Sequence, residues 1–143
     1  MADESTVSKS KKVTLKVEKI FEDAPLPIKP KTKTDAGFDG FGEAYFSTIN
    51  QNDIKGWKKH TKMTLNLVVP VGAIEFVVYD EDKKDFFCVI LSQKNHQRLT
   101  VKAGLWMAFR GIDKNNMLLN LASIEHDPNE AMNTEIDEIK YEW

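Results

Sequence analysis

Cysteine is almost absent from this sequence, and so is any long hydrophobic run. The 143-residue chain has a single cysteine, Cys88, which cannot form a disulfide within the chain. A chain without internal disulfides suits a reducing compartment, and the apolar neighbours of this residue in FFCVI predict a buried, structural thiol. Uninterrupted apolar stretches reach only about five residues, far fewer than the roughly 20 that a membrane-spanning helix needs. We therefore expect a cytoplasmic protein with no membrane partner.

Several familiar catalytic signatures are missing as well. The chain has no glycine-rich phosphate loop, no GxSxG sequence and no CxxC pair. Its net charge of −2 gives no general reason to expect a nucleic-acid partner. The N-terminal MADESTVSKSKK lacks the apolar core of a secretory signal, so we expect residues 1–12 to form a mobile tail.

Short apolar segments with alternating polarity make up most of the rest. They read VTLKVEKI (13–20), AYFSTI (44–49), TLNLVVPVG (64–72), AIEFVVYDED (73–82), DFFCVILS (85–92), QRLTVKAG (97–104) and MLLNLASI (117–124). Each is rich in Val, Ile, Leu or aromatic residues and is bounded by polar residues or glycine, which is typical of strands. Their spacing predicts a single all-β domain over residues 13–143, most simply a jelly-roll barrel. Only the short, acidic C-terminal segment DPNEAMNTEIDEI has a helix-like composition.

An isolated histidine precedes the third of these segments. His60 stands among Lys58, Lys59 and Lys62 in IKGWKKHTKMTLNLVVPVG. An imidazole suits proton transfer near neutral pH, and adjacent cations disfavour its protonated form. Counting by twos along a strand predicts that Lys58 and His60 share a face with Asn66. The alternative is a solvated histidine on a basic turn at the rim of the barrel.

The segments around this histidine, taken together, resemble a known family. IKGWKKH with TLNLVVPVG, RLTVKAGLWMAF, LLNLASIEHDPNE and DEIKYEW are similar, in order and spacing, to dTDP-4-dehydrorhamnose 3,5-epimerases. The resemblance covers about residues 13–143, and related dTDP-sugar 3,4-ketoisomerases share the architecture. It implies a cupin-type jelly roll, a nucleotide-sugar substrate, and chemistry beside the ketone of a dTDP-4-keto-6-deoxyhexose in deoxysugar and surface polysaccharide biosynthesis.

The resemblance also implies roles for particular residues. The family's Arg-Gly becomes Lys-Gly here, so Lys55 is expected to meet the pyrophosphate of the nucleotide. Lys58 fills the family's first histidine position and His60 the second, which makes His60 the implied base. Lys58 then stabilises an enolate or itself serves as the base. The tyrosine that the family places opposite the base is missing from MLLNLAS, where Asn120 is the central polar residue, and Tyr45 does not match that position.

Further side chains are candidates for substrate binding. Trp57 and Trp106 lie in the segments that flank the expected cavity. Each ring either stacks on the base or sugar of the substrate or packs in the core of the protein. Arg110 is a second candidate for a phosphate contact. Asn66 and Asn120 are the polar candidates within otherwise apolar strands.

A metal site is not expected. Compared with metal-binding cupins, the His-x-His pair becomes Lys58 and His60, the following glutamate is missing from KMTLN, and Met107 replaces the distant histidine. The other histidines, His96 and His126, stand in polar, turn-like contexts and are expected at the surface. We therefore predict that the protein uses neither a metal nor another cofactor.

The sequence supports two interpretations of function and predicts one oligomeric state. The chain is a sugar-nucleotide epimerase or isomerase, or it is a non-catalytic cupin that binds a sugar nucleotide or a partner protein. The strand predicted at residues 13–20 has no hairpin partner, because the proline-rich APLPIKPK follows it. An unpaired strand edge is a liability that a second subunit covers, so a homodimer is expected.

Overall fold

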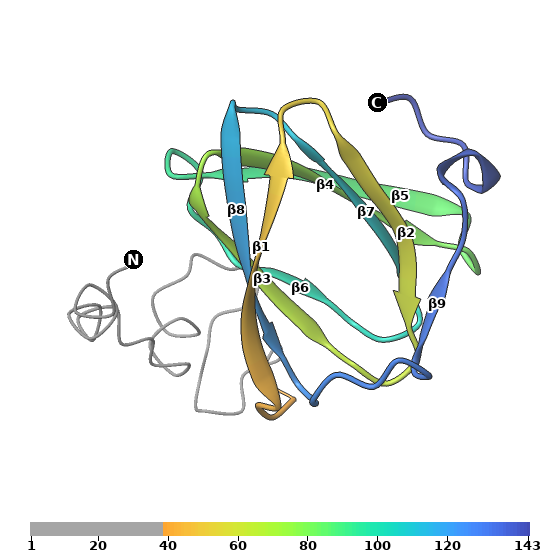
Figure 1. The fold of residues 1–143 in the computed structure, drawn as a ribbon. Coiled ribbons are helices and arrows are strands. Elements are labelled where there is room, and N and C mark those ends of the chain that lie inside the picture. Colours follow the sequence, from red (N-terminus) through yellow and green to blue (C-terminus); the bar gives the residue numbers. More distant parts are fainter. Residues whose placement is uncertain (1–38) are drawn as a thin grey trace.

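A computed structural model describes residues 39–143, which form two antiparallel sheets (Figure 1). The elements are β1 (Glu43–Asn50), β2 (Ile54–His60), β3 (Leu65–Val71), β4 (Ala73–Asp80), β5 (Asp85–Ser92), β6 (Leu99–Val101), β7 (Trp106–Gly111), β8 (Asn115–Ala122), β9 (Ala131–Asn133) and the 3-10 helix η2 (Ile136–Glu138). The predicted tail at 1–12 and the predicted strand at 13–20 lie outside the described residues.

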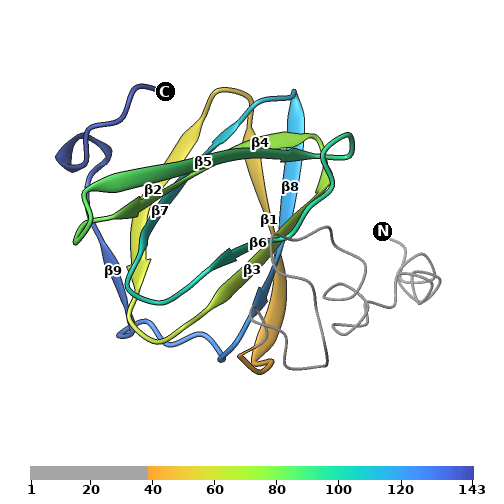
Figure 2. The same cartoon turned by 180° about the vertical axis from the view of Figure 1, so that it is seen from behind.

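The chain passes repeatedly from one sheet to the other. The first sheet has the strand order β1-β8-β3-β6, and the second has the order β5-β4-β7-β2-β9. Views from the front and from behind show these sheets facing each other, with β1 and β8 opposite β2 and β7 (Figures 1 and 2). The prediction of an all-β jelly roll is confirmed.

The space between the sheets holds most of the apolar core. Alternate residues of β3 and β4 point inward, as the period of two in their sequences predicts. Phe76 and Ile74 are fully buried, and Leu67 is 2% exposed. The turn after β4 also follows prediction, because Asp80 Oδ1 accepts hydrogen bonds from the backbone N–H groups of Asp82 and Lys83.

Cys88 contradicts its prediction, because this thiol is exposed. It lies on β5, which is the edge strand of the second sheet. The apolar run FFCVI is typical of a strand buried on both faces, but here only alternate side chains such as Leu91 reach the core. The outward thiol lies 2.9 Å from the hydroxyl of Tyr141.

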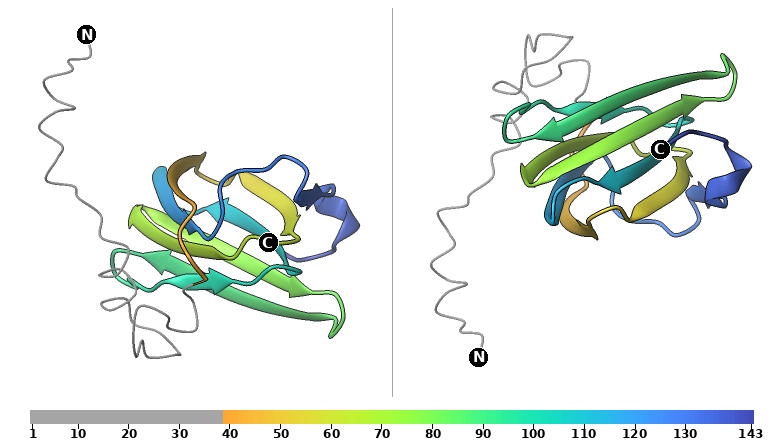
Figure 3. Two further views of the ribbon diagram at one scale, coloured as in Figure 1. Left: turned by 90° about the horizontal axis from the view of Figure 1, so that it is seen from below. Right: turned by 90° about the horizontal axis from the view of Figure 1, so that it is seen from above.

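The C-terminal segment also differs from expectation. Its helix-like composition gives a strand, β9, which pairs with β2 from Lys58 to His60, and then only the single turn of η2. Strand pairing overrides composition here because the free edge of β2 is available. The segment then runs along the outside of β2, away from β1 and β8 (Figure 3). Among residues 39–143, no helix is long and apolar enough to cross a membrane.

Candidate active site

A bulge in β2 decides which of its side chains meet the space between the sheets. Opposite β7, Lys55 pairs with Phe109 but Lys58 pairs with Met107, so β2 has one extra residue between the two pairs. Strict alternation would place Lys55 and Lys58 on opposite faces, whereas the bulge lets both line the same cavity. Glycine is required at position 56, since a Cβ there would lie 2.3 Å from that of Ala108.

The cavity has a volume of about 820 Å³ and lies between the two sheets. This size is within the range of small-molecule sites. Its polar lining comes from β1, β2, β9 and the loop between β8 and β9, and its apolar lining comes mainly from β3, β7 and β8. The polar lining residues include Glu43, Tyr45, Ser47, Lys55, Lys58, His60, His126, Asp127 and Glu130.

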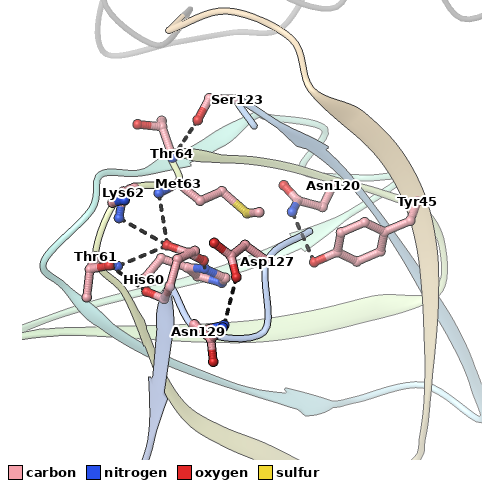
Figure 4. A network of polar contacts seen from close by, with 11 residues as sticks. Tyr45, His60, Thr61, Lys62, Met63, Thr64, Asn120, Ser123, Asp127 and Asn129 are labelled. Carbon is pink, nitrogen blue, oxygen red and sulfur yellow. Dashed lines mark hydrogen bonds and ion pairs between the residues drawn. The ribbon is translucent and has the colours of Figure 1, made fainter. Parts of the chain in front are cut away.

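His60 ends β2 and is held by a carboxylate from a distant part of the chain. Its Nδ1 contacts Glu130 Oε1, and the side chains are 13% and 2% exposed. Glu130 Oε2 also accepts hydrogen bonds from the backbone N–H groups of Thr61 (3.1 Å), Lys62 (3.0 Å) and Met63 (3.2 Å) (Figure 4). An acceptor on Nδ1 places the proton of the neutral ring there and leaves the lone pair of Nε2 free.

The environment of Glu130 keeps its carboxyl ionised. Burial acts to raise the pKa of this group, but the hydrogen bonds from His60 and from the amides of Lys62 and Met63 outweigh it. The pKa of Glu130 is therefore lowered from its usual value. An ionised carboxylate on Nδ1 stabilises the positive charge that the ring gains when Nε2 takes a proton.

The loop that delivers Glu130 is shaped by its own sequence. Asp127 Oδ1 accepts a hydrogen bond from Asn129 N–H at 2.9 Å, and Glu130 N–H donates to the carbonyl of Asp127 at 3.2 Å. This is the turn expected of an Asp-Pro-Asn sequence. It returns the chain toward the end of β2, where the Thr61 hydroxyl donates to the Glu130 carbonyl at 2.6 Å.

The first sheet contributes a tyrosine to the same cavity. Tyr45 on β1 is directly opposite Asn120 on β8, and Asn120 Nδ2 donates a hydrogen bond to the Tyr45 hydroxyl at 3.1 Å (Figure 4). Asn120 is fully buried, and its Oδ1 accepts the backbone N–H of Asn66 at 3.2 Å. Asn120 thus reaches the cavity only through Tyr45.

The predicted site residues divide into two groups. The structure brings His60, Lys58 and Lys55 together around the cavity, with Lys55 Nζ 3.3 Å from the Thr48 carbonyl. Asn66 does not share their face, although counting by twos predicted that it would, because a turn separates β2 from β3. Its side chain accepts the Thr100 hydroxyl at 2.7 Å instead.

Trp57 and Arg110 lie on the outer face of the second sheet rather than in the cavity. Trp57 is fully buried there; its indole N–H donates to the Ile136 carbonyl at 3.2 Å and its ring lies 6.1 Å from that of Trp143. Arg110 donates to Glu75 Oε1 at 2.8 Å. Trp57 therefore anchors the C-terminal segment, and Arg110 has a carboxylate partner on the neighbouring strand.

Trp106 and Lys59 lie on that outer face as well. The indole of Trp106 donates to Glu81 Oε2 at 3.2 Å, and the ammonium of Lys59 lies 4.9 Å from the centre of the Trp106 ring. Of the three lysines near the histidine in the sequence, only Lys58 lines the cavity.

Sequence analysis missed four of the cavity residues in their present role. The sequence presents Glu130 and Asp127 only as part of an acidic segment of helix-like composition, and it predicts His126 at the surface. His126 is indeed exposed, yet it lines the cavity. Tyr45 was set aside because it is not on the strand where a tyrosine was sought. The Asp-Pro-Asn turn was the available signal that this segment reverses toward the barrel.

We predict that catalytic activity survives treatment with a chelator. No three His, Cys, Asp or Glu side chains among residues 39–143 form a group that could hold a metal ion. Lys58 and Met107, both in the cavity, are poor ligands for zinc, iron or manganese. Turnover should be equal before and after dialysis against EDTA. Stoichiometric metal in untagged protein, with activity lost on its removal and restored on its return, would contradict this.

Comparisons with known proteins bear on this site. No protein-family model matches the chain, and no curated protein matches it. The crystal structure of a dTDP-sugar isomerase from Desulfovibrio desulfuricans G20 is similar, with 28% sequence identity and a TM-score of 0.72, and the match covers 84% of this chain and 88% of that one.

Two further solved structures share the fold at lower identity. A 3'-monoepimerase from Streptomyces bikiniensis, in complex with dTDP, is 15% identical with a TM-score of 0.68 over 75% of this chain and 59% of that one. A sugar 3,4-ketoisomerase from Thermoanaerobacterium thermosaccharolyticum, in complex with TDP, is 18% identical with a TM-score of 0.59 over 69% of this chain and 70% of that one. The resemblance drawn from the sequence, to cupin-type dTDP-sugar epimerases and isomerases, is confirmed by these structures.

Proposed function

We propose that this protein is a sugar-nucleotide epimerase or isomerase that acts beside the ketone of a dTDP-4-keto-6-deoxyhexose. The observation that carries the proposal is the His60–Glu130 pair, which presents a free imidazole nitrogen in a cavity of about 820 Å³. The isomerase from Desulfovibrio desulfuricans, similar over most of both chains, supports the substrate class. Analysis of the product distinguishes 3,5-epimerisation from a shift of the ketone.

Removal of a proton beside a ketone needs a base and a means to stabilise the negative charge that forms. His60 Nε2 takes the proton from carbon, while Glu130 holds Nδ1 and stabilises the imidazolium. Lys58, two residues earlier on the same wall of the cavity, supplies a positive charge near the developing enolate oxygen. In a ketone shift, the ring nitrogen then returns the proton to the neighbouring carbon. Epimerisation instead needs a proton donor on the opposite side of the sugar ring, which protonates the same carbon from its other face.

Lys55 is the residue proposed to meet the pyrophosphate. It lines the cavity at the other end of β2 from His60. Within residues 39–143, its ammonium has no carboxylate contact and meets only the Thr48 carbonyl. A hydrogen bond to a charged group contributes about 1.5–3 kcal/mol, which corresponds to roughly 10–100-fold in affinity.

Lys55→Ala should therefore weaken dTDP binding by about tenfold or more at low salt, and the loss should shrink as salt screens the phosphates. Calorimetric titration with dTDP at two ionic strengths measures both effects. Lys102→Ala is the matched control, since Lys102 pairs with Asp39 at 2.8 Å outside the cavity. Equal affinities for the Lys55→Ala and wild-type proteins would remove Lys55 from the site.

The reaction is tested by solvent exchange. Incubation with dTDP-4-keto-6-deoxyglucose in deuterated water should place deuterium at a carbon next to the ketone, and the position is read by nuclear magnetic resonance. Label at C3 and C5 with inverted centres indicates double epimerisation, and label with a moved carbonyl indicates keto-isomerisation. Tight dTDP binding without exchange on any such substrate would favour the non-catalytic cupin instead.

We also propose that the protein works as a homodimer. The proposal rests on the strand predicted at residues 13–20, which has no hairpin partner in the sequence. Light scattering coupled to size-exclusion chromatography at micromolar concentration should give about twice the chain mass of 16.3 kDa. A mass of one chain would overturn this proposal without affecting the assignment of the reaction.

A further inference from the structure

Trp57 joins the bulge of β2 to the segment that follows β9, residues 134–143. Its backbone N–H donates to the Thr134 carbonyl at 3.1 Å, and its carbonyl accepts the Thr134 N–H at 3.0 Å. Its indole N–H donates to the Ile136 carbonyl at 3.2 Å. The main chain and the side chain of this one residue are therefore both tied to segment 134–143.

Segment 134–143 also closes a second apolar core on the outer face of the second sheet. Trp57, Val77 and Ala108 are fully buried in this core. Figures 1 and 2 both show the segment beside β2 and away from β1 and β8. The apolar side chains that it packs against the core are Ile136, Ile139, Tyr141 and Trp143. The indole of Trp57 thus fills a site that is separated from the cavity by the sheet itself.

The direction of the Trp57 side chain determines which neighbouring side chains enter the cavity. After the bulge, Trp57 and Lys59 lie on the outer face, whereas Lys58 and His60 line the cavity. A shift of one residue moves every side chain of a strand to the opposite face. Without the extra residue, strict alternation from Lys55 would therefore turn Trp57 into the cavity and His60 out of it. Bulges next to active sites re-aim side chains in this way.

We propose that Trp57, held from behind by segment 134–143, is a positioning residue that sets where Lys58 and His60 stand in the cavity. This proposal rests on the proposed function. Trp57 does not line the cavity, so it acts through the main chain of β2.

The two ends of β2 depend on Trp57 to different degrees. From Lys58 to His60, β2 pairs with β9, which leads directly into segment 134–143. Lys55 lies before the bulge and pairs with Phe109 on β7. A loosened Trp57 should therefore misplace the proposed base and leave the proposed pyrophosphate contact in place.

The test compares Trp57→Phe with the wild-type protein by the rate of deuterium incorporation at saturating substrate and by dTDP affinity. Phenylalanine keeps an aromatic ring but loses the bond to the Ile136 carbonyl. A misplacement of about 1 Å costs up to about 10²-fold in rate, so we expect exchange to slow by about 10–10²-fold while dTDP affinity stays near the wild-type value. Trp106→Phe is the matched control, since it removes an indole bond to Glu81 on the same face. It should exchange at the wild-type rate.

A second variant loosens Trp57 without changing β2. The ring of Trp143 lies 6.1 Å from that of Trp57, so Trp143→Ala should also slow exchange and spare dTDP affinity. If Trp57→Phe does not fold, Trp143→Ala carries the test alone.

Each outcome supports or overturns the proposal. Slower exchange with intact dTDP affinity, in Trp57→Phe and Trp143→Ala but not in Trp106→Phe, supports it. Exchange at the wild-type rate in the first two overturns it, as does equal slowing in Trp106→Phe, which would reflect a loss of stability anywhere on this face. Weaker dTDP binding with unchanged kcat overturns it as well. A wild-type protein that binds dTDP but exchanges no proton overturns the proposed function itself, and this proposal with it.

Discussion

His60→Asn should abolish solvent exchange of the proton beside the ketone and leave nucleotide-sugar binding nearly intact. Asparagine keeps a polar side chain of similar reach but offers no nitrogen that accepts a proton at neutral pH. General base catalysis contributes about 10²–10⁴-fold, so exchange should fall by at least that range. The measurement is the initial rate of deuterium incorporation, with dTDP affinity determined on the same preparation.

The controls for this substitution come from the two other histidines of the chain. His96→Asn changes an exposed residue between β5 and β6 and should exchange deuterium at the wild-type rate. His126→Asn changes a residue that lines the same cavity, so it shows whether the loss of any cavity histidine slows exchange or only the loss of His60. If His60→Asn exchanges normally, the imidazole is a bystander, and Lys58→Met becomes the variant that identifies the base.

The face on which each residue of β2 lies could not be predicted from the sequence. A period of two placed Lys58 and His60 together correctly, because both follow the bulge. The same period, without the bulge, would have turned Lys55 away from them. Gly56 was the signal, since a glycine within a strand often accompanies a bulge or a close approach of backbones.

Trp57 and Arg110 show that proximity to the cavity in the sequence does not reveal which face of the sheet a side chain occupies. Both stand in segments that flank the cavity in sequence, but side chains alternate between faces along a strand. Trp57 and Arg110 point to the outer face, where the C-terminal segment and Glu75 contact them. No local pattern shows that the outer face is covered, because the residues covering it come from the end of the chain.

Long-range pairing explains why the partner of His60 was missed. Seventy positions separate His60 from Glu130. Glu130 is one of several acidic residues in a segment of helix-like composition, and most of the carboxylates in that segment are exposed. Glu130 differs because three consecutive backbone N–H groups, from Thr61 to Met63, need an acceptor where β2 ends. That need belongs to the folded chain and leaves no trace in the sequence around Glu130.

Glu130→Gln should lower the exchange rate about as much as loss of the base itself. The three backbone N–H groups require an oxygen where Oε2 now lies, so the amide NH₂ of glutamine must face the histidine. His60 Nδ1 then has to accept a hydrogen bond, which moves the ring proton to Nε2 and removes the basic lone pair from the cavity. Loss of the correct tautomer costs up to about 10⁴-fold in a comparable Ser-His-Asp site, and we expect about 10²–10⁴-fold here.

The control for this change neutralises a carboxylate that pairs with Lys59 on the other face of β2. Glu81→Gln removes an equal charge from a carboxylate that contacts Lys59, outside the cavity, and should leave exchange at the wild-type rate. Glu130→Ala reports the contribution of this side chain to folding, since it leaves three backbone N–H groups, of which that of Met63 is buried, without their acceptor. Loss of these hydrogen bonds should lower the free energy of unfolding by about 1–3 kcal/mol.

Acid denaturation independently measures how much the ionised Glu130 carboxylate contributes to the stability of the fold. The pKa of Glu130 is lower in the folded protein than its usual value of 4.5, so ionised Glu130 stabilises the fold above that value. This contribution is lost as the pH falls through the lowered folded pKa. Urea unfolding of the wild-type protein should therefore lose stability steeply below about pH 4.5, and Glu130→Gln should show a shallower loss over the same interval. Equal slopes for the two proteins would mean that the Glu130 carboxylate does not hold His60 and the end of β2 in solution as it does in the structure.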